Sequence, residues 1–336
     1  MRTGKGKVLS DAQIGTSVAV DTSAVTGGGR MAGYTRNRCD KLAERGPGFT
    51  LAHGAAMLYL DRVPSPPLDR FIASIWFCQS EPRPFALERV LPSGTAQLIV
   101  NLKEDRTRMY HPESGAMTAN CGTIFSGIST RFGVIDTAEQ ECVAGVSFRP
   151  GGTSAFFAMP AHQLRDTDIP LELLWDRGRA ARLREQVLAA ASPTAKLDAL
   201  ERALAEARSA HTFDPAIAMA LDAFAGGLEL ANIPAVADRL GLSPKRLVER
   251  FKSTVGMTPK RYCRILRFQR ALTSAERGRR VDWTRIAMDC GYFDQAHFIH
   301  DFRSFAGITP TGYDAGRTQF RNHVHFLQAD AAAGVR

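Results

Sequence analysis

The chain has 336 residues, of which 44% are hydrophobic and 23% charged, a composition typical of a soluble globular protein with two domains. No run approaches the ~18 apolar residues that span a bilayer, and the stretch Met1–Val20 lacks the apolar block of a secretory signal. We therefore expect a cytoplasmic protein with no membrane partner. The six cysteines form no CxxC pair and no metal-ligand spacing with the histidines, which predicts reduced thiols, no metal and no cofactor.

The net charge of +9 is concentrated towards the carboxyl end. Between Ala231 and Thr318 there are sixteen Lys and Arg residues against eight Asp and Glu residues, a difference of +8. A local excess of this kind suits a polyanionic partner such as double-stranded DNA, although a solvated basic surface would have the same composition.

Residues 1–56 are rich in Gly, Ser, Thr and charged side chains and show no periodicity, so we expect a disordered extension. From Met57 the chain contains short apolar runs separated by turn residues, among them ERVLPSGTAQLIVNL, GTIFSGIST and CVAGVSFRPGG. This pattern predicts a small β-barrel or curled sheet. After Gly152 the apolar residues recur at spacings of three and four, which predicts helices.

Asp214 and Pro215 open a further predicted helix, which ends at the pair Gly226-Gly227. We take this pair as the joint between a sensor or dimerisation domain over residues 57–225 and a DNA-binding domain over residues 228–318, followed by a tail over residues 319–336. Aromatic residues of the first domain either line an apolar pocket for an unknown ligand or form plain core: Trp76, Phe77, Phe125, Phe148 and Phe156.

Two passages in the second domain repeat one another: GLSPKRLVERFKSTVGMTP from Gly241 and GYFDQAHFIHDFRSFAGITP from Gly291. Residues before the turn match at an offset of fifty and residues after it at an offset of fifty-one, so one residue is inserted in the second turn. A match that stays in register on both sides of one loop insertion indicates an internal duplication.

Each copy is predicted to form a helix, a tight glycine turn and a second helix, which is the helix-turn-helix geometry. The recognition helices are expected over Pro244–Val255 and Gln295–Ala306, and the pairs Leu247/Phe251 and Phe298/Phe302 are expected to be buried. The outward faces supply the predicted DNA contacts: Lys245, Arg246, Glu249 and Lys252 in the first unit, and Gln295, Ala296, His297, Ile299, His300 and Arg303 in the second.

One helix over Pro259–Arg277 is expected to join the two units and to set the recognition helices in successive major grooves. The helix starts at Thr258 and Thr309 present free backbone N–H groups and are predicted phosphate contacts. The arginines of this linker recur every three residues and spread around the helix, where they either contact phosphate or pair with acidic groups of the protein.

These passages resemble the double helix-turn-helix domain of the AraC/XylS family of bacterial transcription regulators, and the likeness covers roughly Ile233 to Arg317. It implies a DNA-binding activator or repressor whose amino-terminal domain senses a small-molecule effector or mediates homodimer formation. RNA polymerase would be a further partner of an activator. The stretch from Leu58 to Leu204 is similar to the amino-terminal domain of one branch of the family and implies no particular ligand.

The fold class predicted is α+β: an amino-terminal β-rich, barrel-like domain with helices, and a carboxy-terminal all-α domain with two helix-turn-helix units joined by a linker helix. Family members commonly place Arg where this chain has Glu249 and His300. Because a glutamate accepts a hydrogen bond from cytosine N4 whereas an arginine donates to guanine, the family's base preferences do not carry over.

Two other functions fit parts of the sequence. A cupin-like enzyme fused to a DNA-binding segment would need a His-x-His pair close to a carboxylate, whereas His53, His111 and His162 are widely spaced. No GxSxG, phosphate-cradling loop or pair of catalytic carboxylates is present, so we expect no enzymatic activity and no catalytic residue. A regulator without a small-molecule ligand, whose first domain serves only dimerisation, stays open.

Overall fold

The structure, a computed structural model, describes residues 57–82, 87–209, 213–226, 232–277 and 281–326, all within the compact unit Ala32–Arg336. The extension expected over residues 1–56 lies outside the described residues. None of the helices in these ranges combines the length and the hydropathy that a bilayer crossing requires.

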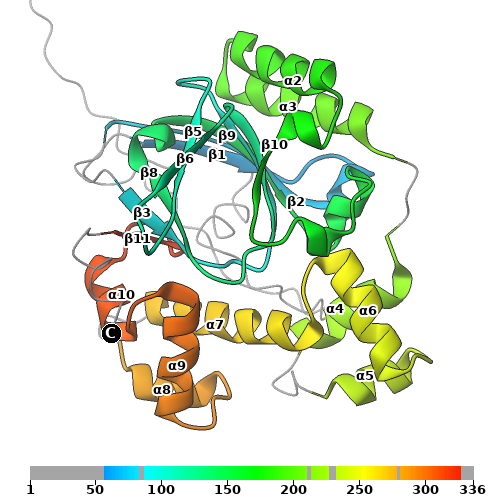
Figure 1. The fold of residues 1–336 in the computed structure, drawn as a ribbon, viewed down its shortest axis with the longest axis vertical. Helices are drawn as coiled ribbons and strands as arrows, with labels where there is room; N and C mark the ends of the chain where they lie inside the picture. Colours follow the sequence, from blue (N-terminus) through cyan, green and yellow to red (C-terminus); the bar gives the residue numbers. More distant parts are fainter. Residues whose placement is uncertain (1–56, 83–86, 210–212, 227–231, 278–280, 327–336) are drawn as a thin grey trace, which may run out of the picture. The chain divides into compact units, whose positions relative to one another are not determined.

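The amino-terminal part is built from two antiparallel sheets (Figure 1). The first has the order β1-β2-β9-β4-β7-β10 and the second the order β11-β3-β8-β5-β6. The strands are β1 (Met57–Arg62), β2 (Ile72–Ser80), β3 (Leu87–Val90), β4 (Gln97–Asn101), β5 (Thr107–Tyr110), β6 (Met117–Asn120), β7 (Thr123–Ser126), β8 (Gly133–Asp136), β9 (Cys142–Phe148), β10 (Asp168–Pro170) and β11 (His323–His325). The β-rich, barrel-like domain predicted from the short apolar runs is confirmed.

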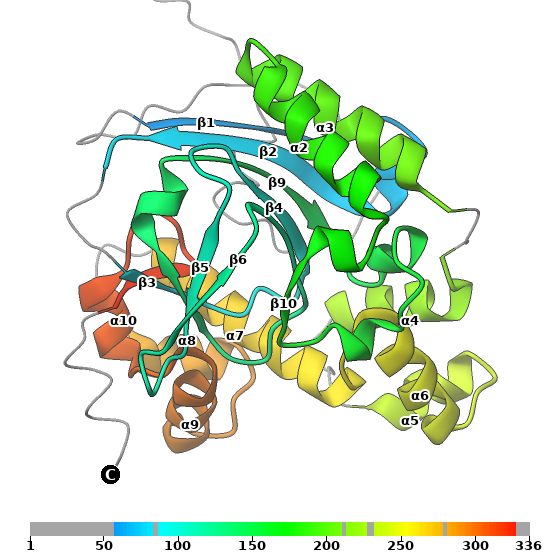
Figure 2. The same ribbon diagram turned by 45° about the horizontal axis from the view of Figure 1, so that its top comes forward.

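Two helices cover one face of the first sheet. Helix α2 (Arg177–Ala189) is capped by Asp176 and helix α3 (Pro193–Ala207) by Ser192, whose side chains accept backbone hydrogen bonds at the helix starts. Figure 2 shows both helices lying over β1, β2 and β9. Leu197, Leu200 and Leu204 of α3 are buried in this core, so the leucine stripe faces the domain's own interior.

The carboxyl end returns to the second sheet. Strand β11 pairs antiparallel with β3, in the register His323 to Val90 and His325 to Glu88. The expectation that residues 319–336 form a tail is therefore wrong up to Phe326. A three-residue strand with one buried residue, Val324, carries too little periodicity to be read from sequence.

The carboxy-terminal part is helical. Its helices are α4 (Pro215–Ala225), α5 (Ile233–Arg239), α6 (Pro244–Val255), α7 (Pro259–Arg277), α8 (Trp283–Asp289), α9 (Gln295–Ala306) and α10 (Pro310–Gly316). Figure 1 shows α7 between the two helical pairs, with α5 and α6 near one end and α8 and α9 near the other. The α+β class is thus confirmed.

Helix α4 packs with these helices and not with the β-rich core. Its buried residues Ile217, Leu221 and Phe224 belong to the cluster that contains α6 and α7. Arg250 of α6 also donates to Asp214, the residue that caps α4, at 2.6 Å. The core contacts of α4 therefore lie with the carboxy-terminal helices, whereas the predicted joint at Gly226-Gly227 would assign α4 to the amino-terminal domain.

Candidate nucleic-acid interface

The two helix-turn-helix units are built by the same local bonds. In the first, Gly241 takes the left-handed conformation at φ 64° and the amide of Leu242 donates to the carbonyl of Ala237 at 2.9 Å. In the second, Gly291 has φ 75° and the amide of Tyr292 donates to Ala287 at 3.0 Å. The duplication inferred from sequence is therefore repeated in the hydrogen bonding of both turns.

The recognition helices begin where the sequence predicts. Ser243 caps α6 by accepting from the amide of Arg246 at 3.3 Å, and Asp294 caps α9 by accepting from His297 at 2.7 Å. Leu247 and Phe251 in α6 are fully buried, as are Phe298 and Phe302 in α9.

The outward faces of α6 and α9 carry most of the predicted DNA contacts. The exposed members are Lys245, Arg246, Glu249, Lys252, Gln295, Ala296, His300 and Arg303. Within the described part of the chain, no side-chain hydrogen bond or ion pair engages Lys245, Arg246, Lys252, Gln295 or Arg303. These donors face solvent and are available to an incoming ligand.

The other predicted contacts are held by the protein itself. His297 is half-buried, with its ring edge against Tyr292, and Ile299 packs against the helical core. The hydroxyls of Thr258 and Thr309 accept from the amides of Arg261 at 3.4 Å and Gly312 at 3.0 Å. Both threonines act as helix caps, and their contact with phosphate stays a prediction.

The linker arginines pair within the protein. Arg264 forms an ion pair with the buried Asp301 of α9 at 2.6 Å, and Arg267 lies over the ring of Tyr292. Arg270 donates to the carbonyl of Ala225 at 2.7 Å. The sequence leaves open whether these arginines contact phosphate or pair within the protein. In the structure, Arg264, Arg267 and Arg270 pair or pack within the protein.

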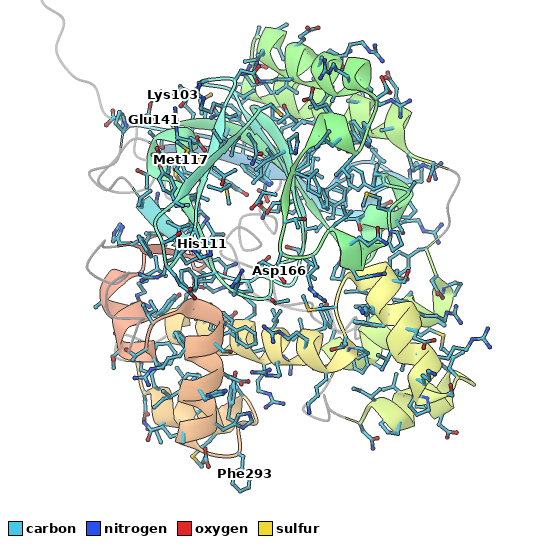
Figure 3. The ribbon with its side chains drawn as sticks, viewed as in Figure 1. Lys103, His111, Met117, Glu141, Asp166 and Phe293 are labelled. Carbon is cyan, nitrogen blue, oxygen red and sulfur yellow. The ribbon has the colours of Figure 1, made fainter. Side chains whose placement is uncertain are left out.

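One strongly exposed residue beside the recognition helix α9 is not among the DNA contacts predicted from the sequence. Phe293 is 91% exposed and projects from the turn between α8 and α9 (Figure 3). Because Tyr292 matches Leu242 and Asp294 matches Ser243, Phe293 is the inserted residue of the second turn. Its lack of a counterpart in the first unit is the signal that could have singled it out.

The aromatic residues of the first domain, for which the sequence leaves open a ligand pocket or plain core, mostly form core. Phe77, Phe125, Phe148 and Phe156 are buried together beneath α2 and α3. A small cavity does touch one of them, and its walls also include Ile128, Arg149 and Val255. It lies where the β-rich part meets α6.

The cysteines and acidic groups form no metal site among the residues described. Burial raises the pKa of Cys263 to about 12 and raises the pKa of Cys290 as well, which keeps both thiols protonated. Burial likewise raises the pKa of Tyr292, whose ring supports the second turn.

Comparison with known proteins adds the family. A family model described as a helix-turn-helix domain matches residues 236–316. The activator RhaS of Escherichia coli O157:H7 is 36% identical over 89 residues, 26% of this chain and 32% of RhaS. The carboxy-terminal domain is similar to the helix-turn-helix domain of AraC/XylS-family regulators. Residues 236–316 thus carry a helix-turn-helix domain of the kind found in bacterial DNA-binding regulators, and the chain spans about a third of the length of the curated relatives it matches.

The remaining matches are less informative. Residues 61–170 match a domain of unknown function (DUF6597). Two solved structures of ToxT from Vibrio cholerae are also similar. One, from strain O395, has a TM-score of 0.39 and 11% identity and covers 71% of this chain and 95% of ToxT. The other, bound to an unsaturated fatty acid, has a TM-score of 0.39 and 9% identity and covers 79% of this chain and 96% of ToxT.

Proposed function

We propose that this protein is a cytoplasmic, sequence-specific transcription regulator that reads two adjacent major-groove segments of duplex DNA with α6 and α9. The observation that supports this most directly is the repeated pair of capped helices, each with a buried apolar row and a solvent-facing row of donors. A recognition helix enters the major groove with its amino-terminal residues against base edges. Lys245 and Gln295 occupy that part of the two helices.

The chemistry of each face suits a different part of the duplex. Gln295 has a carbonyl and an amide and pairs with adenine, whereas Lys245 and Arg246 pair with guanine or phosphate. Glu249 favours cytosine N4 at its position in the first unit. Lys252 and Arg303 lie about two turns further along their helices than Lys245 and Gln295, and phosphates are the expected contacts there.

The β-rich domain is proposed to be a sensor or dimerisation domain. An effector-responsive regulator needs a physical connection between its two domains, and the small cavity bordered by Arg149 and by Val255 of α6 offers one. A small molecule, a second copy of the chain and, for an activator, RNA polymerase are the partners proposed. A regulator whose amino-terminal domain only dimerises is the alternative.

The test is a binding-site selection with the full chain, followed by titration of the selected duplex against random competitor. Lys245→Ala and Gln295→Ala should each weaken the selected site by ~1–3 kcal/mol. Lys103→Ala is the matched control, because Lys103 pairs with Glu141 on the β-rich domain, far from α6 and α9 in Figure 3. If no duplex is enriched over competitor, the proposed function is wrong.

A further inference from the structure

The loop between β7 and β8, residues 127–132, touches both helix-turn-helix units. The touching points are Gly256 and Gly307, the residues that end α6 and α9. They match one another in the duplication at an offset of fifty-one. A single loop of the β-rich domain therefore contacts the same structural position in each copy.

Both contacts are close. A Cβ atom on Gly256 would lie 2.6 Å from Cγ2 of Ile128, and one on Gly307 would lie 2.2 Å from Cε1 of Phe132. These separations are shorter than van der Waals contact, so each loop side chain occupies space that only a glycine leaves open. Ile128 is buried and belongs to the same hydrophobic cluster as the recognition helices, against which Phe132 also packs.

The centre of the loop is tied to the linker helix. The carbonyl oxygen of Thr130 accepts a hydrogen bond from Nη2 of Arg261, in the first turns of α7, at 2.9 Å. The same guanidinium lies over the ring of Phe305 in α9. The loop thus contacts the end of one recognition helix, the linker and the end of the other recognition helix in turn.

Asp166 fixes the loop from the side of the β-rich domain. Its carboxylate accepts from the amide of Thr130 at 2.5 Å and from the Thr130 hydroxyl at 2.9 Å, and its own amide donates to Ile128 at 3.1 Å. Asp166 has φ 57°, a left-handed conformation that is uncommon outside glycine. In Figure 3 it lies on the side of the strands that faces α7.

The loop holds the ends of the recognition helices that are opposite their reading ends. A 12-residue helix such as α6 or α9 is about 18 Å long. A tilt of about 10° at Gly256 or Gly307 would therefore move the amino-terminal reading residues by about 3 Å, close to the ~3.4 Å rise of one base pair. Small changes at the loop become changes of register at the DNA.

We propose that the loop 127–132 is a brace that fixes the separation and phase of the two recognition helices, with Ile128 and Phe132 as positioning residues. The inference rests on the proposed function, since it assumes that α6 and α9 both read DNA. It assigns the β-rich domain a direct part in DNA selectivity: the spacing between the half-sites depends on the brace as well as on α7.

The experiment uses the full chain and three duplexes: the selected site, the same site with one base pair added between its half-sites, and a single half-site. Wild type should lose at least about tenfold in affinity when the base pair is added, because the loss of even one good base contact has that size. Ile128→Ala/Phe132→Ala should reduce this penalty to about threefold or less while leaving single half-site affinity unchanged. Merely structural damage would lower all three affinities together.

A second variant and a control make the result decisive. Asp166→Gly keeps the left-handed backbone accessible but removes both carboxylate acceptors, so it loosens the loop without touching either unit and should have the same effect on spacing. Met117→Ala truncates an exposed side chain on the edge strand β6 and should behave as wild type. If both loop variants keep the wild-type spacing penalty, the brace is refuted. If wild type itself prefers no sequence, it is the proposed function that fails.

Discussion

Replacing Gly307 by alanine should destabilise the protein more than replacing Gly241, although both glycines have nearly the same backbone. Gly241 has φ 64° and Gly307 has φ 68°. A Cβ on Gly241 would meet nothing within 4 Å, whereas a Cβ on Gly307 would overlap the ring of Phe132 at 2.2 Å. The pair of substitutions therefore separates the backbone cost from the packing cost.

The magnitudes follow from these two terms. An L-residue in the left-handed region costs about 1–2 kcal/mol, which is the whole effect expected for Gly241→Ala. Overpacking adds about 1–3 kcal/mol, so Gly307→Ala should lower the free energy of unfolding by about 2–5 kcal/mol. Urea denaturation of the full chain, followed by circular dichroism, measures both.

Phe132 supplies the internal control. In a Phe132→Ala background the ring is gone, so Gly307→Ala should cost no more than Gly241→Ala does. The coupling between the two positions should be about 1–3 kcal/mol. Equal destabilisation by Gly241→Ala and Gly307→Ala in the wild-type background would show that the loop does not press on α9, and the reasoning would be refuted.

Three further outcomes are expected. Asp301→Ala should lower the free energy of unfolding by about 1.5–3 kcal/mol in the same denaturation assay, because it removes a buried charged hydrogen bond to Arg264, whose side chain keeps 28% exposure. Phe293→Ser should leave the Tm unchanged. It should abolish a roughly fourfold preference for thymine over uracil at one operator position, because burying the thymine methyl against the Phe293 ring contributes about 0.8 kcal/mol. Equal discrimination by variant and wild type in a gel-shift titration would exclude a contact between Phe293 and a thymine methyl. Burial raises the pKa of Asp61 to about 6, so its contribution to stability is full below about pH 4 and lost as the pH rises through 6. The Tm of Asp61→Asn should therefore exceed that of wild type increasingly from about pH 4 to about pH 7, and a constant difference would contradict the assignment.

The helical units could be predicted in detail because their determinants are local. Ser243, Asp294 and the turn glycines act within a few residues of where they stand, and the two members of the buried apolar pair in each unit lie about one helical turn apart. The expected limits Pro244–Val255 and Gln295–Ala306 coincide with those observed. The roles of the outward residues in DNA binding stay predictions, because no local rule distinguishes a solvated face from a groove-facing one.

Contacts between distant segments could not be predicted in this way. An arginine every three residues on α7 fixes only the direction of each side chain, and its partner depends on which element packs there. Arg261 meets a carbonyl 131 residues away, and Arg264 meets Asp301. The pairing of β11 with β3 is of the same kind, since a short strand is specified mainly by the edge that receives it.

Gly256 and Gly307 show why a sequence can indicate a residue correctly and still conceal its role. A left-handed helix end and a close approach by another side chain both require the absence of a Cβ atom, so glycine satisfies either condition and both at once. Gly241 meets only the first condition, because its surroundings are open. Gly256 and Gly307 meet both conditions. A helix end alone would tolerate Asn at these positions, whereas the contacts with Ile128 and Phe132 exclude any side chain there. Gly307→Asn should therefore keep the left-handed helix end and still lose the packing against Phe132. This substitution separates the role of Gly307 in ending the helix from its role in admitting the Phe132 ring.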